Sequence, residues 1–343
     1  MKKAKHVSAN RKPKGEGAVL ERIERIAGRV GVRGAGVRLG IGDDAAIFRG
    51  TKGFDQILTC DWFLEDSHFL RDKHPADAVG WKCLARAVSD IAAMGGMPRC
   101  FLLSLALPSS HIDLWLNEFL EGLRRAGKKF GCILAGGDTT RRKEILINVT
   151  VVGEARTGQA VLRSGARPGD ILFVSGRLGE AELGLRQIRA SKRRADSRSA
   201  LLRKHLYPEP RLALGRWLGE MDLPSAMMDL SDGLSTDLPR LCAASRVGAR
   251  VEAAKIPAVR LPNQVAAKLG TDPLALALHG GDDYELLFTV PQRRLHRLPR
   301  SFQRLPLTAI GEVTHQRELL LVDEVGREAP LRNQGWDPFR QRS

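Results

Sequence analysis

Met227-Met228-Asp229-Leu230-Ser231-Asp232-Gly233 joins an apolar run to an acidic turn. The apolar residues predict a short buried strand, and Ser231-Asp232-Gly233 is typical of a turn that follows it directly. Carboxylates recur in the same setting elsewhere, beside small or hydroxyl-bearing residues and mostly next to apolar runs. These further turns are Gly42-Asp43-Asp44, Thr59-Cys60-Asp61, Ser89-Asp90, Gly136-Gly137-Asp138-Thr139-Thr140 and Gly280-Gly281-Asp282-Asp283-Tyr284-Glu285. In a chain of net charge +16, this is where the acidic residues gather.

Acidic turns of this kind are typical of a magnesium site that serves a nucleotide. Carboxylates brought together from several turns repel one another unless cations lie between them. Magnesium prefers hard oxygen ligands, a few carboxylates together with water and substrate phosphates, whereas calcium is disfavoured because no EF-hand spacing occurs. Any single aspartate could simply cap its own turn or helix. Because the pattern occurs in six turns, mostly at the ends of apolar strands, we favour a shared magnesium site.

Two glycine-rich segments resemble phosphate-binding loops without meeting their requirements. Gly122 to Lys128 begins like a Walker loop, but Lys129 stands where Ser or Thr should bind the metal, and the segment continues a helix. Gly40 to Ala45 has the spacing of a dinucleotide loop, yet its two carboxylates would repel a pyrophosphate unless a cation intervened. The His-Arg-Asp and Asp-Phe-Gly motifs of protein kinases are absent. The acidic turns are therefore the best candidates for the chemistry.

The composition predicts a soluble globular protein with two domains. The chain has 343 residues, of which 43% are hydrophobic and 27% charged, which excludes disorder for most of its length. No apolar run approaches the roughly 18 residues of a membrane span, and no apolar stretch follows the basic start as in a secretory signal. The five cysteines form no Cys-x-x-Cys pair, which disfavours a zinc site and favours a reducing, cytoplasmic location.

The positive charge is concentrated in two segments, residues 1–14 and 189–204. Both segments are typical of a solvated tail or loop. A surface that binds single-stranded nucleic acid would carry tryptophan or tyrosine among its basic residues, for the bases to stack on, and neither segment alternates such residues with its basic ones. We therefore expect no specific nucleic-acid partner. Non-specific contact with RNA or with anionic lipid is the alternative, and RNA binding of this kind would be sensitive to salt.

Periodicity predicts mixed helices and strands in both halves of the chain. Helical patterns cover 18–30, 75–94 and 112–130, and a strand with a Gly-Gly-Asp turn is expected at 133–135. The other expected strands are 57–60, 100–107, 145–152, 171–174, 227–230, 285–290 and 319–322. We expect a basic disordered tail over 1–17, an N-terminal domain over 18–157 that binds metal and ATP and forms a dimer, and a C-terminal domain over 158–343. The predicted class is α+β in both domains.

With these motifs in this order, the chain resembles the thiamine-monophosphate kinase family of the aminoimidazole ribonucleotide synthetase-like superfamily. The resemblance covers most of residues 18–339. Besides the acidic turns, it rests on His68-Phe69, Trp81-Lys82-Cys83-Leu84-Ala85, Val88 to Gly95 and Arg163-Ser164-Gly165-Ala166. The Asp-Leu-Ser-Asp-Gly and Gly-Gly-Asp-Thr-Thr pieces alone would indicate only the superfamily.

The resemblance implies a two-domain fold of mixed sheets packed with helices, and a homodimer that pairs through its N-terminal domains. It implies magnesium-dependent phosphorylation of thiamine monophosphate by ATP. Because phosphoryl transfer needs alignment and charge neutralisation more than a protein nucleophile, we expect direct in-line transfer without a covalent intermediate. The residues that it assigns to several magnesium ions are Asp44, Thr59, Cys60, Asp61, Asp90, Asp138, Asp229 and Asp232, of which Asp138 and Asp232 are also candidates for assisting the transfer. It assigns Gly137, Asp138, Arg163 and Ser231 to ATP, and His68, Asp282 and Trp336 to thiamine monophosphate.

Three positions depart from the family pattern. Asp282 stands where the family usually has glutamate, Cys60 where it has threonine, and Pro338 where a histidine is common. A thiol is a poor magnesium ligand, so Cys60 can serve a metal only through its backbone carbonyl. The alternatives are another ATP-dependent enzyme of the superfamily with a different acceptor, and a basic nucleic-acid-binding protein on the same fold. Residues 1–59 lack the cysteine expected of a selenophosphate synthetase, and Ser343 ends the chain where the hydrogenase-maturation carbamoyl dehydratase would end in cysteine.

Overall fold

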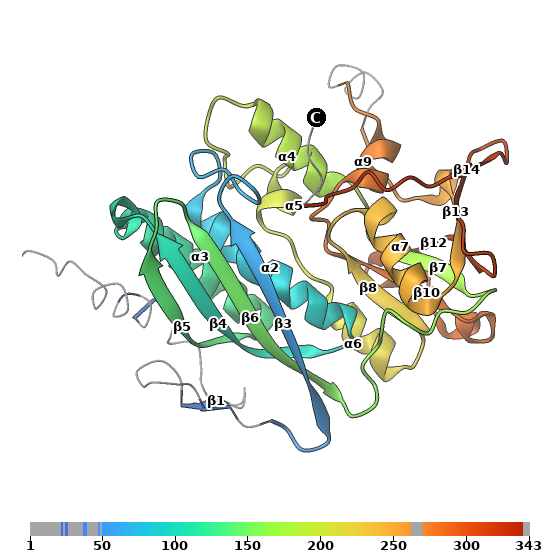
Figure 1. Cartoon of the computed structure of the whole chain (residues 1–343), viewed down its shortest axis with the longest axis horizontal. Coiled ribbons are helices and arrows are strands. Elements are labelled where there is room, and N and C mark those ends of the chain that lie inside the picture. Colours follow the sequence, from blue (N-terminus) through green and yellow to red (C-terminus); the bar gives the residue numbers. More distant parts are fainter. Residues whose placement is uncertain are drawn as a thin grey trace, which may run out of the picture.

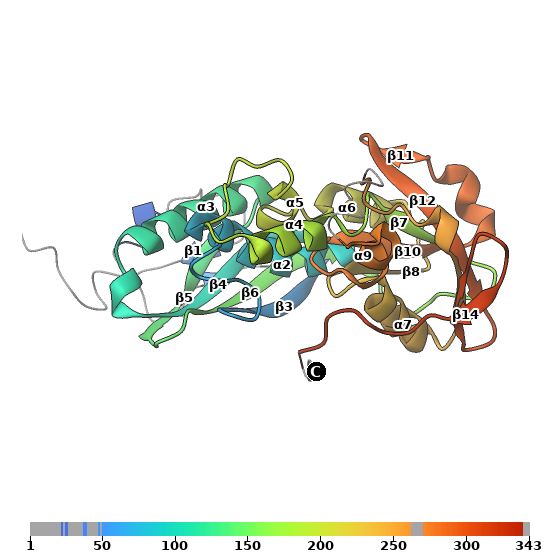
Figure 2. The ribbon, with the colours of Figure 1, turned by 90° about the horizontal axis from the view of Figure 1, so that it is seen from above.

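Two units, each a sheet with helices packed against it, lie side by side along the long axis of the molecule (Figure 1 and Figure 2). The structure is a computed structural model, and it describes residues 22, 25–26, 37–39, 47–48, 50–261 and 270–338. The helix expected over 18–30 is helical at the three residues described there, while the tail 1–17 lies outside the described residues. None of the helices in these ranges is both long and apolar enough to cross a membrane.

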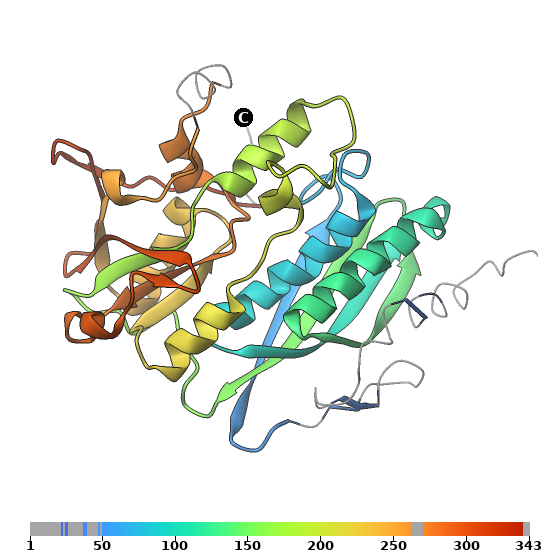
Figure 3. The same ribbon diagram turned by 180° about the vertical axis from the view of Figure 1, so that it is seen from behind.

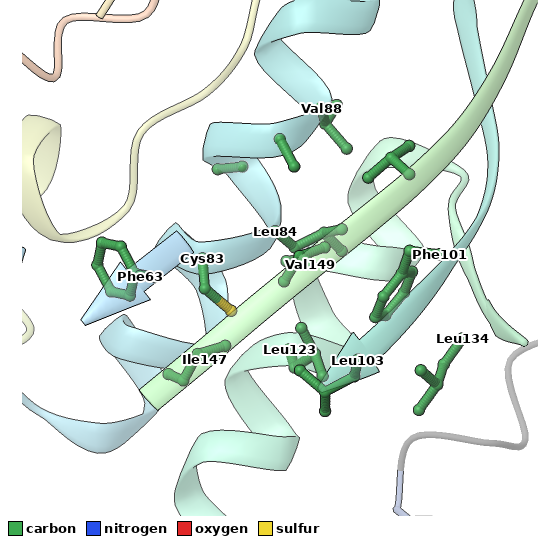
Figure 4. Packing of buried hydrophobic residues seen from close by; sticks show 14 of the residues in the cluster. Phe63, Cys83, Leu84, Val88, Phe101, Leu103, Leu123, Leu134, Ile147 and Val149 are labelled. Atoms are coloured by element: carbon green, nitrogen blue, oxygen red, sulfur yellow. The ribbon is translucent and has the colours of Figure 1, made fainter. Parts of the chain in front are cut away.

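The first unit is a four-stranded sheet in the order β3-β6-β4-β5, with two long helices on one face (Figure 3). Its elements are β3 (Phe54–Leu64), α2 (Ala76–Ala93), β4 (Met97–Leu107), α3 (Leu114–Phe130), β5 (Ile133–Arg141) and β6 (Leu146–Arg156). Strands β4 and β5 are parallel and the other pairs are antiparallel. Alternate residues of each strand face the helices, because side chains in a strand point to opposite faces in turn. Figure 4 shows Phe101, Val149, Leu84 and Leu123 packed together between sheet and helices.

Helices α2 and α3 pack backbone to backbone. A Cβ atom added to Gly80 would come within 2.0 Å of the Phe119 carbonyl oxygen, and one added to Gly122 within 1.9 Å of the Asp77 carbonyl oxygen. Glycine is therefore needed at both contacts. The segment around Gly122 that begins like a Walker loop is thus the middle of a packed helix, as the sequence predicts.

The second unit is a larger sheet in the order β14-β13-β9-β12-β7-β10-β8, with β11 paired to β12. One face packs against α7 (Leu234–Ser245) and α9 (Pro273–His279), and the other against α6 (Leu212–Glu220). Its strands are β7 (Ile171–Ser175), β8 (Ala226–Leu230), β9 (Gly248–Glu252), β10 (Glu285–Val290), β11 (Ser301–Phe302), β12 (Leu305–Thr314), β13 (Leu319–Val322) and β14 (Glu328–Pro330). A separate small ribbon pairs β1 (Val37–Leu39) with β2 (Ile47–Phe48).

The connection from β7 to β8 packs against helix α2 of the first unit. It contains α4 (Glu180–Ala190), α5 (Arg203–Leu206) and α6. The indole nitrogen of Trp81 donates a hydrogen bond to the Pro208 carbonyl oxygen at 2.8 Å, and a Cβ on Gly215 would come within 2.0 Å of the Ala92 carbonyl oxygen. Helix α2 is thus covered on one side by its own sheet and on another by chain from the second half.

Most predicted elements are found within a few residues of their expected ends, with two exceptions. The predicted strand 57–60 is only the middle of β3, and the predicted turn at Gly136-Gly137-Asp138 is wrong, because β5 continues through it to Arg141. Parallel pairing with β4 keeps the segment extended. A Cβ on Gly137 would come within 1.9 Å of the Leu103 carbonyl oxygen, so the glycine serves the close approach of two strands.

Candidate active site

A pocket of about 300 Å³ lies where the two units meet. The segment after β3 and helix α2 line it from the first unit, and the turns before α7 and β10 line it from the second. The C-terminal segment around Trp336 closes one side, held by a 2.9 Å hydrogen bond from its backbone nitrogen to the Asp232 carbonyl oxygen. Five residues singled out from the sequence meet in this pocket: His68, Ser231, Asp232, Asp282 and Trp336.

His68 and Trp336 form an aromatic wall of the pocket. Their ring centroids are 6.2 Å apart, and His68 also lies 5.6 Å from the ring of Phe63. The Leu64 backbone nitrogen donates to Nδ1 of His68 at 3.0 Å, which fixes the ring. Burial, followed by the positive charge of Arg86, lowers the pKa of His68 to about 4. The imidazole is therefore neutral near pH 7 and leaves the aromatic wall without a positive charge.

Asp282 is held by the first unit although it belongs to the second. Its carboxylate accepts hydrogen bonds from Nζ of Lys82 at 2.7 Å and from the hydroxyl of Tyr284 at 2.8 Å. Burial acts to raise the pKa of Asp282, but Lys82, His205 and Arg86 outweigh it and hold the carboxyl well below its usual range. Asp282 and Tyr284 have φ angles of 67° and 50°, which are strained for residues with a side chain. Asp282 thus lines the pocket as an ionised carboxylate.

The other two acids of the Gly-Gly-Asp-Asp-Tyr-Glu motif have structural contacts. Asp283 accepts hydrogen bonds from the backbone nitrogens of Gly179 and Ala181 at the start of α4. Glu285 is fully buried and pairs with Lys204 at 2.6 Å and with Arg211, while Ser175 donates to it at 2.6 Å. The motif therefore contributes one carboxylate to the pocket and uses two to fix the chain around it.

Three carboxylates lie near one another at the C-terminal part of α2. The hydroxyl of Thr59 donates to Asp90, and burial followed by the charges of Asp229 and Asp61 raises the pKa of Asp90 to about 7. Burial, followed by the charges of Asp237 and Asp61, also raises the pKa of Asp229 to about 7. Arg163 opposes both shifts. We call Asp61, Asp90 and Asp229 the acidic cluster; its members repel one another.

The acidic cluster fits magnesium by its chemistry. Its donors are carboxylate and hydroxyl oxygens, the type that magnesium prefers, and their mutual repulsion is what a cation relieves. Within the described ranges, no three Asp, Glu, His or Cys side chains are already gathered closely enough to form a metal site.

A buried aspartate that the sequence analysis did not single out fixes the turn after β8. Asp237 accepts hydrogen bonds from the backbone nitrogens of Ser231 and Asp232 at 3.1 and 2.9 Å. Arg240 pairs with both Asp232 and Asp237. Asp237 could have been found in the sequence, because it is an acidic residue in the first turn of the helix that follows Ser231-Asp232-Gly233. Acidic residues are favoured at the N-terminal end of a helix.

Two of the proposed metal-binding residues, Cys60 and Asp138, lie on the face of the first sheet that points away from α2 and α3. Thr59 and Asp61 share the strand face of Phe63, towards α2, so the side chain of Cys60 points the other way, with Sγ 3.1 Å from Nδ2 of Asn148. Asp138 is exposed and pairs in register with Ser104, also on the face away from the helices. Gly137 lies beside it in β5, Arg163 is exposed, and Asp44 lies outside the described residues.

Comparison with known proteins relates most of the chain to one family. A family model described as AIR synthase related protein, N-terminal domain, matches residues 42–155, and its C-terminal counterpart matches residues 167–323. The thiamine-monophosphate kinase of Escherichia coli (strain K12) is 36% identical over 324 residues, which are 92% of this chain and 97% of the relative.

Solved structures give the same result. The crystal structure of thiamine-monophosphate kinase from Stenotrophomonas maltophilia K279a is 35% identical, with a TM-score of 0.74, and the match covers 88% of this chain and 94% of that one. The structure of AaThiL complexed with AMPPCP and TMP is 31% identical, with a TM-score of 0.73, over 95% of this chain and 97% of that one. The two-domain α+β fold predicted from the sequence is confirmed.

Proposed function

The chain belongs to the thiamine-monophosphate kinase family, and we propose that it transfers the γ-phosphoryl group of ATP to thiamine monophosphate, giving thiamine diphosphate and ADP. One observation in particular supports this function. A pocket with an aromatic wall and an ionised Asp282 reaches the middle of helix α2 at Arg86, and the acidic cluster follows towards the C-terminal end of the helix. The first suits an aromatic cation, and the second suits a metal–phosphate complex.

The pocket residues would bind the thiamine part of the acceptor. The face of Trp336 is suited to the positively charged thiazolium, because a cation is attracted to the electron-rich face of an aromatic ring. The carboxylate of Asp282 adds a negative charge, and the neutral His68 adds no repulsion. In this assignment Asp282 reaches the substrate although it is one carbon shorter than the usual glutamate.

We assign the remaining residues that the resemblance marks to the binding of magnesium and ATP. Thr59, the acidic cluster, Asp44 and Asp232 would hold magnesium, and Gly137, Arg163 and Ser231 would contact ATP. Bound there, magnesium would neutralise the carboxylates and the phosphate oxygens. Cys60 and Asp138 face away from α2, so they can contribute only from the open face of the sheet.

The reaction is a direct transfer between two phosphates. An oxygen of the acceptor phosphate attacks the γ-phosphorus, the bond to the β–γ bridging oxygen breaks, and ADP leaves. Such a transfer needs alignment and charge neutralisation more than a protein nucleophile. We therefore expect no phosphorylated enzyme; isolation of one that forms and decays at the rate of turnover would contradict this mechanism.

We propose that two copies pair through the face of the first sheet that lacks helices. Among the described residues this face presents Leu58, Trp62 and Leu102, which are 70%, 56% and 40% exposed. Large exposed apolar residues on one sheet face are typical of a protein interface. We also keep residues 18–157 and 158–343 as the two domains, and a cytoplasmic location consistent with five free cysteines.

A substitution in the acidic cluster tests this function without threatening the fold. Asp229→Asn removes one of three repelling charges, so the thermal midpoint should stay equal or rise. Thiamine diphosphate formation, measured by chromatography, should fall by about 100-fold or more, as expected for loss of electrostatic help in phosphoryl transfer. Asp222→Asn is the matched control, because Asp222 is exposed and pairs only with Arg294 in the described structure.

Two results would contradict the assignment. Near-normal turnover by Asp229→Asn would remove the acidic cluster from the reaction. Absence of thiamine diphosphate from the wild-type protein, with ATP hydrolysis intact, would move the search to a different acceptor on the same fold.

A further inference from the structure

Helix α2 presents three charged side chains along one face. Lys82, Arg86 and Asp90 follow one another at intervals of four residues, which places them on the same side of the helix, about 6 Å apart along its axis. Lys82 binds Asp282 of the pocket, and Asp90 belongs to the acidic cluster. Arg86 stands between the two ends of the site.

Arg86 has one fixed partner and faces the pocket. Its Nε lies 3.2 Å from Oδ1 of Asp61, and its side chain is 18% exposed. The structure gives no hydrogen-bond acceptor among the described residues for its two terminal nitrogens, and the residue lines the pocket beside His68 and Asp282. The fork of the guanidinium is thus available to a ligand.

The charge of Arg86 is secure. A guanidinium stays protonated at every pH at which a protein is normally studied, and the carboxylates of Asp61 and Asp282 lie near that of Arg86. A guanidinium that keeps its charge and offers two parallel donors is the group best matched to a phosphate.

From this placement we propose that Arg86 binds the phosphate group of the acceptor, thiamine monophosphate. The inference rests on the proposed function and adds a residue that the sequence motifs did not mark. An acceptor whose thiamine lies between Trp336 and Asp282 must direct its phosphate towards the acidic cluster, where the donor phosphates lie. Along α2 that path passes Arg86. The guanidinium offsets the charge of the acceptor while the ion pair with Asp61 fixes its position.

Binding measurements without turnover separate the phosphate from the rest of the acceptor. Titration calorimetry with magnesium but no ATP gives the dissociation constants of thiamine monophosphate and of thiamine, which lacks the phosphate. In Arg86→Gln, binding of thiamine monophosphate should weaken roughly ten- to a hundredfold, the cost of a charged hydrogen-bond pair. Binding of thiamine should change by less than about twofold, since the pocket around Trp336 is intact.

Two further variants control for charge and for folding. Arg86→Lys keeps the charge but loses the fork, so it should recover part of the lost affinity. Arg124→Gln removes the same charge from α3, where Arg124 pairs with Glu121, and should bind both ligands as the wild type does. Thermal midpoints of all variants show whether they are folded.

Three results would overturn the inference, and each has a different meaning. Equal weakening of thiamine and thiamine monophosphate in Arg86→Gln would mean that Arg86 only shapes the pocket. Weakened ATP binding with unchanged thiamine monophosphate would place Arg86 on the donor side. A wild-type protein that neither binds nor phosphorylates thiamine monophosphate would reject the proposed function itself, and the inference with it.

Discussion

At the scale of single residues, the site depends on side chains whose charge state is set by their neighbours. Asp282 is ionised because Lys82 reaches it from the other unit, and His68 is neutral because it is buried beside Arg86. The pocket therefore offers a carboxylate and uncharged aromatic rings to an aromatic cation.

Trp336 tests the thiamine end of this description. Trp336→Ala should raise the Michaelis constant for thiamine monophosphate roughly tenfold and leave that for ATP nearly unchanged, because a cation–π contact acts on the thiazolium alone. Trp336→Phe should show a smaller effect. Steady-state kinetics with each substrate varied in turn gives both constants. Equal increases would instead mean that Trp336 only fixes the C-terminal segment to the turn at Asp232.

The lowered pKa of His74 predicts how the stability of the fold depends on pH. Its Nε2 lies 3.0 Å from Nε2 of His205, and burial followed by the charge of Lys82 lowers its pKa to about 4. The unfolded chain takes up this proton near pH 6.5, so the stabilisation is complete above that pH and is lost as the pH falls towards 4. At its steepest the loss from this one group is about 1.4 kcal/mol per pH unit.

Urea denaturation of the wild type and of His74→Gln at several pH values measures this contribution. The difference in unfolding free energy between the two proteins should shrink on acidification from pH 6.5 to 4. A constant difference over that range would show that His74 does not titrate as described.

At the scale of elements, the site is positioned by buried contacts between segments far apart in the chain. Glu285 at the start of β10 holds Lys204 and Arg211, which flank the loop from α5 to α6 that packs against α2. This contact joins the turn that carries Asp282 to the chain covering α2.

Breaking that contact should loosen the molecule. Glu285→Gln leaves two cations beside a neutral, buried side chain and should lower the unfolding free energy by about 3 kcal/mol. Glu328→Gln is the matched control, because Glu328 pairs with Arg250 at the surface, and it should change stability far less. Equal effects in chemical denaturation would contradict an anchoring role for Glu285.

The sequence alone predicts the elements better than it predicts which residues meet. The apolar period of α2 and the β-branched, apolar run of β6 predicted those elements correctly, because each buries one face against a core. The continuation of β5 through Gly136-Gly137-Asp138 could not be predicted from the neighbouring residues, because it results from pairing with β4. The acidic turns predicted which types of side chain the site holds. They did not predict the buried partners Lys82 and His205, whose roles arise only when segments up to 200 residues apart are brought together. Asp237 was missed although it acts locally, on backbone nitrogens five and six residues before it.

At the scale of the whole molecule, the open face of the first sheet predicts a dimer. Trp62→Glu places a charge in the middle of this apolar face and should convert the dimer to a monomer in sedimentation velocity experiments. Val325→Glu is the control, because Val325 is also an exposed apolar residue, and more exposed than Trp62, but lies between β13 and β14. A wild-type protein that is monomeric, or a Trp62→Glu variant that stays dimeric, would reject this interface.

Both units contribute residues to the proposed site. The first unit supplies α2 with Lys82, Arg86 and Asp90, and the second supplies Asp229, Asp282 and Trp336. The pocket and the acidic cluster exist only because α2 lies against the second half of the chain.

Phosphorus NMR of the intact protein tests the central claim most directly. With magnesium, ATP and thiamine monophosphate, the spectrum should show ADP and thiamine diphosphate growing at equal rates. Matched samples without acceptor, or with thiamine in its place, should show neither product at a comparable rate. ADP and inorganic phosphate without thiamine diphosphate, from folded protein, would contradict the claim that this site phosphorylates thiamine monophosphate.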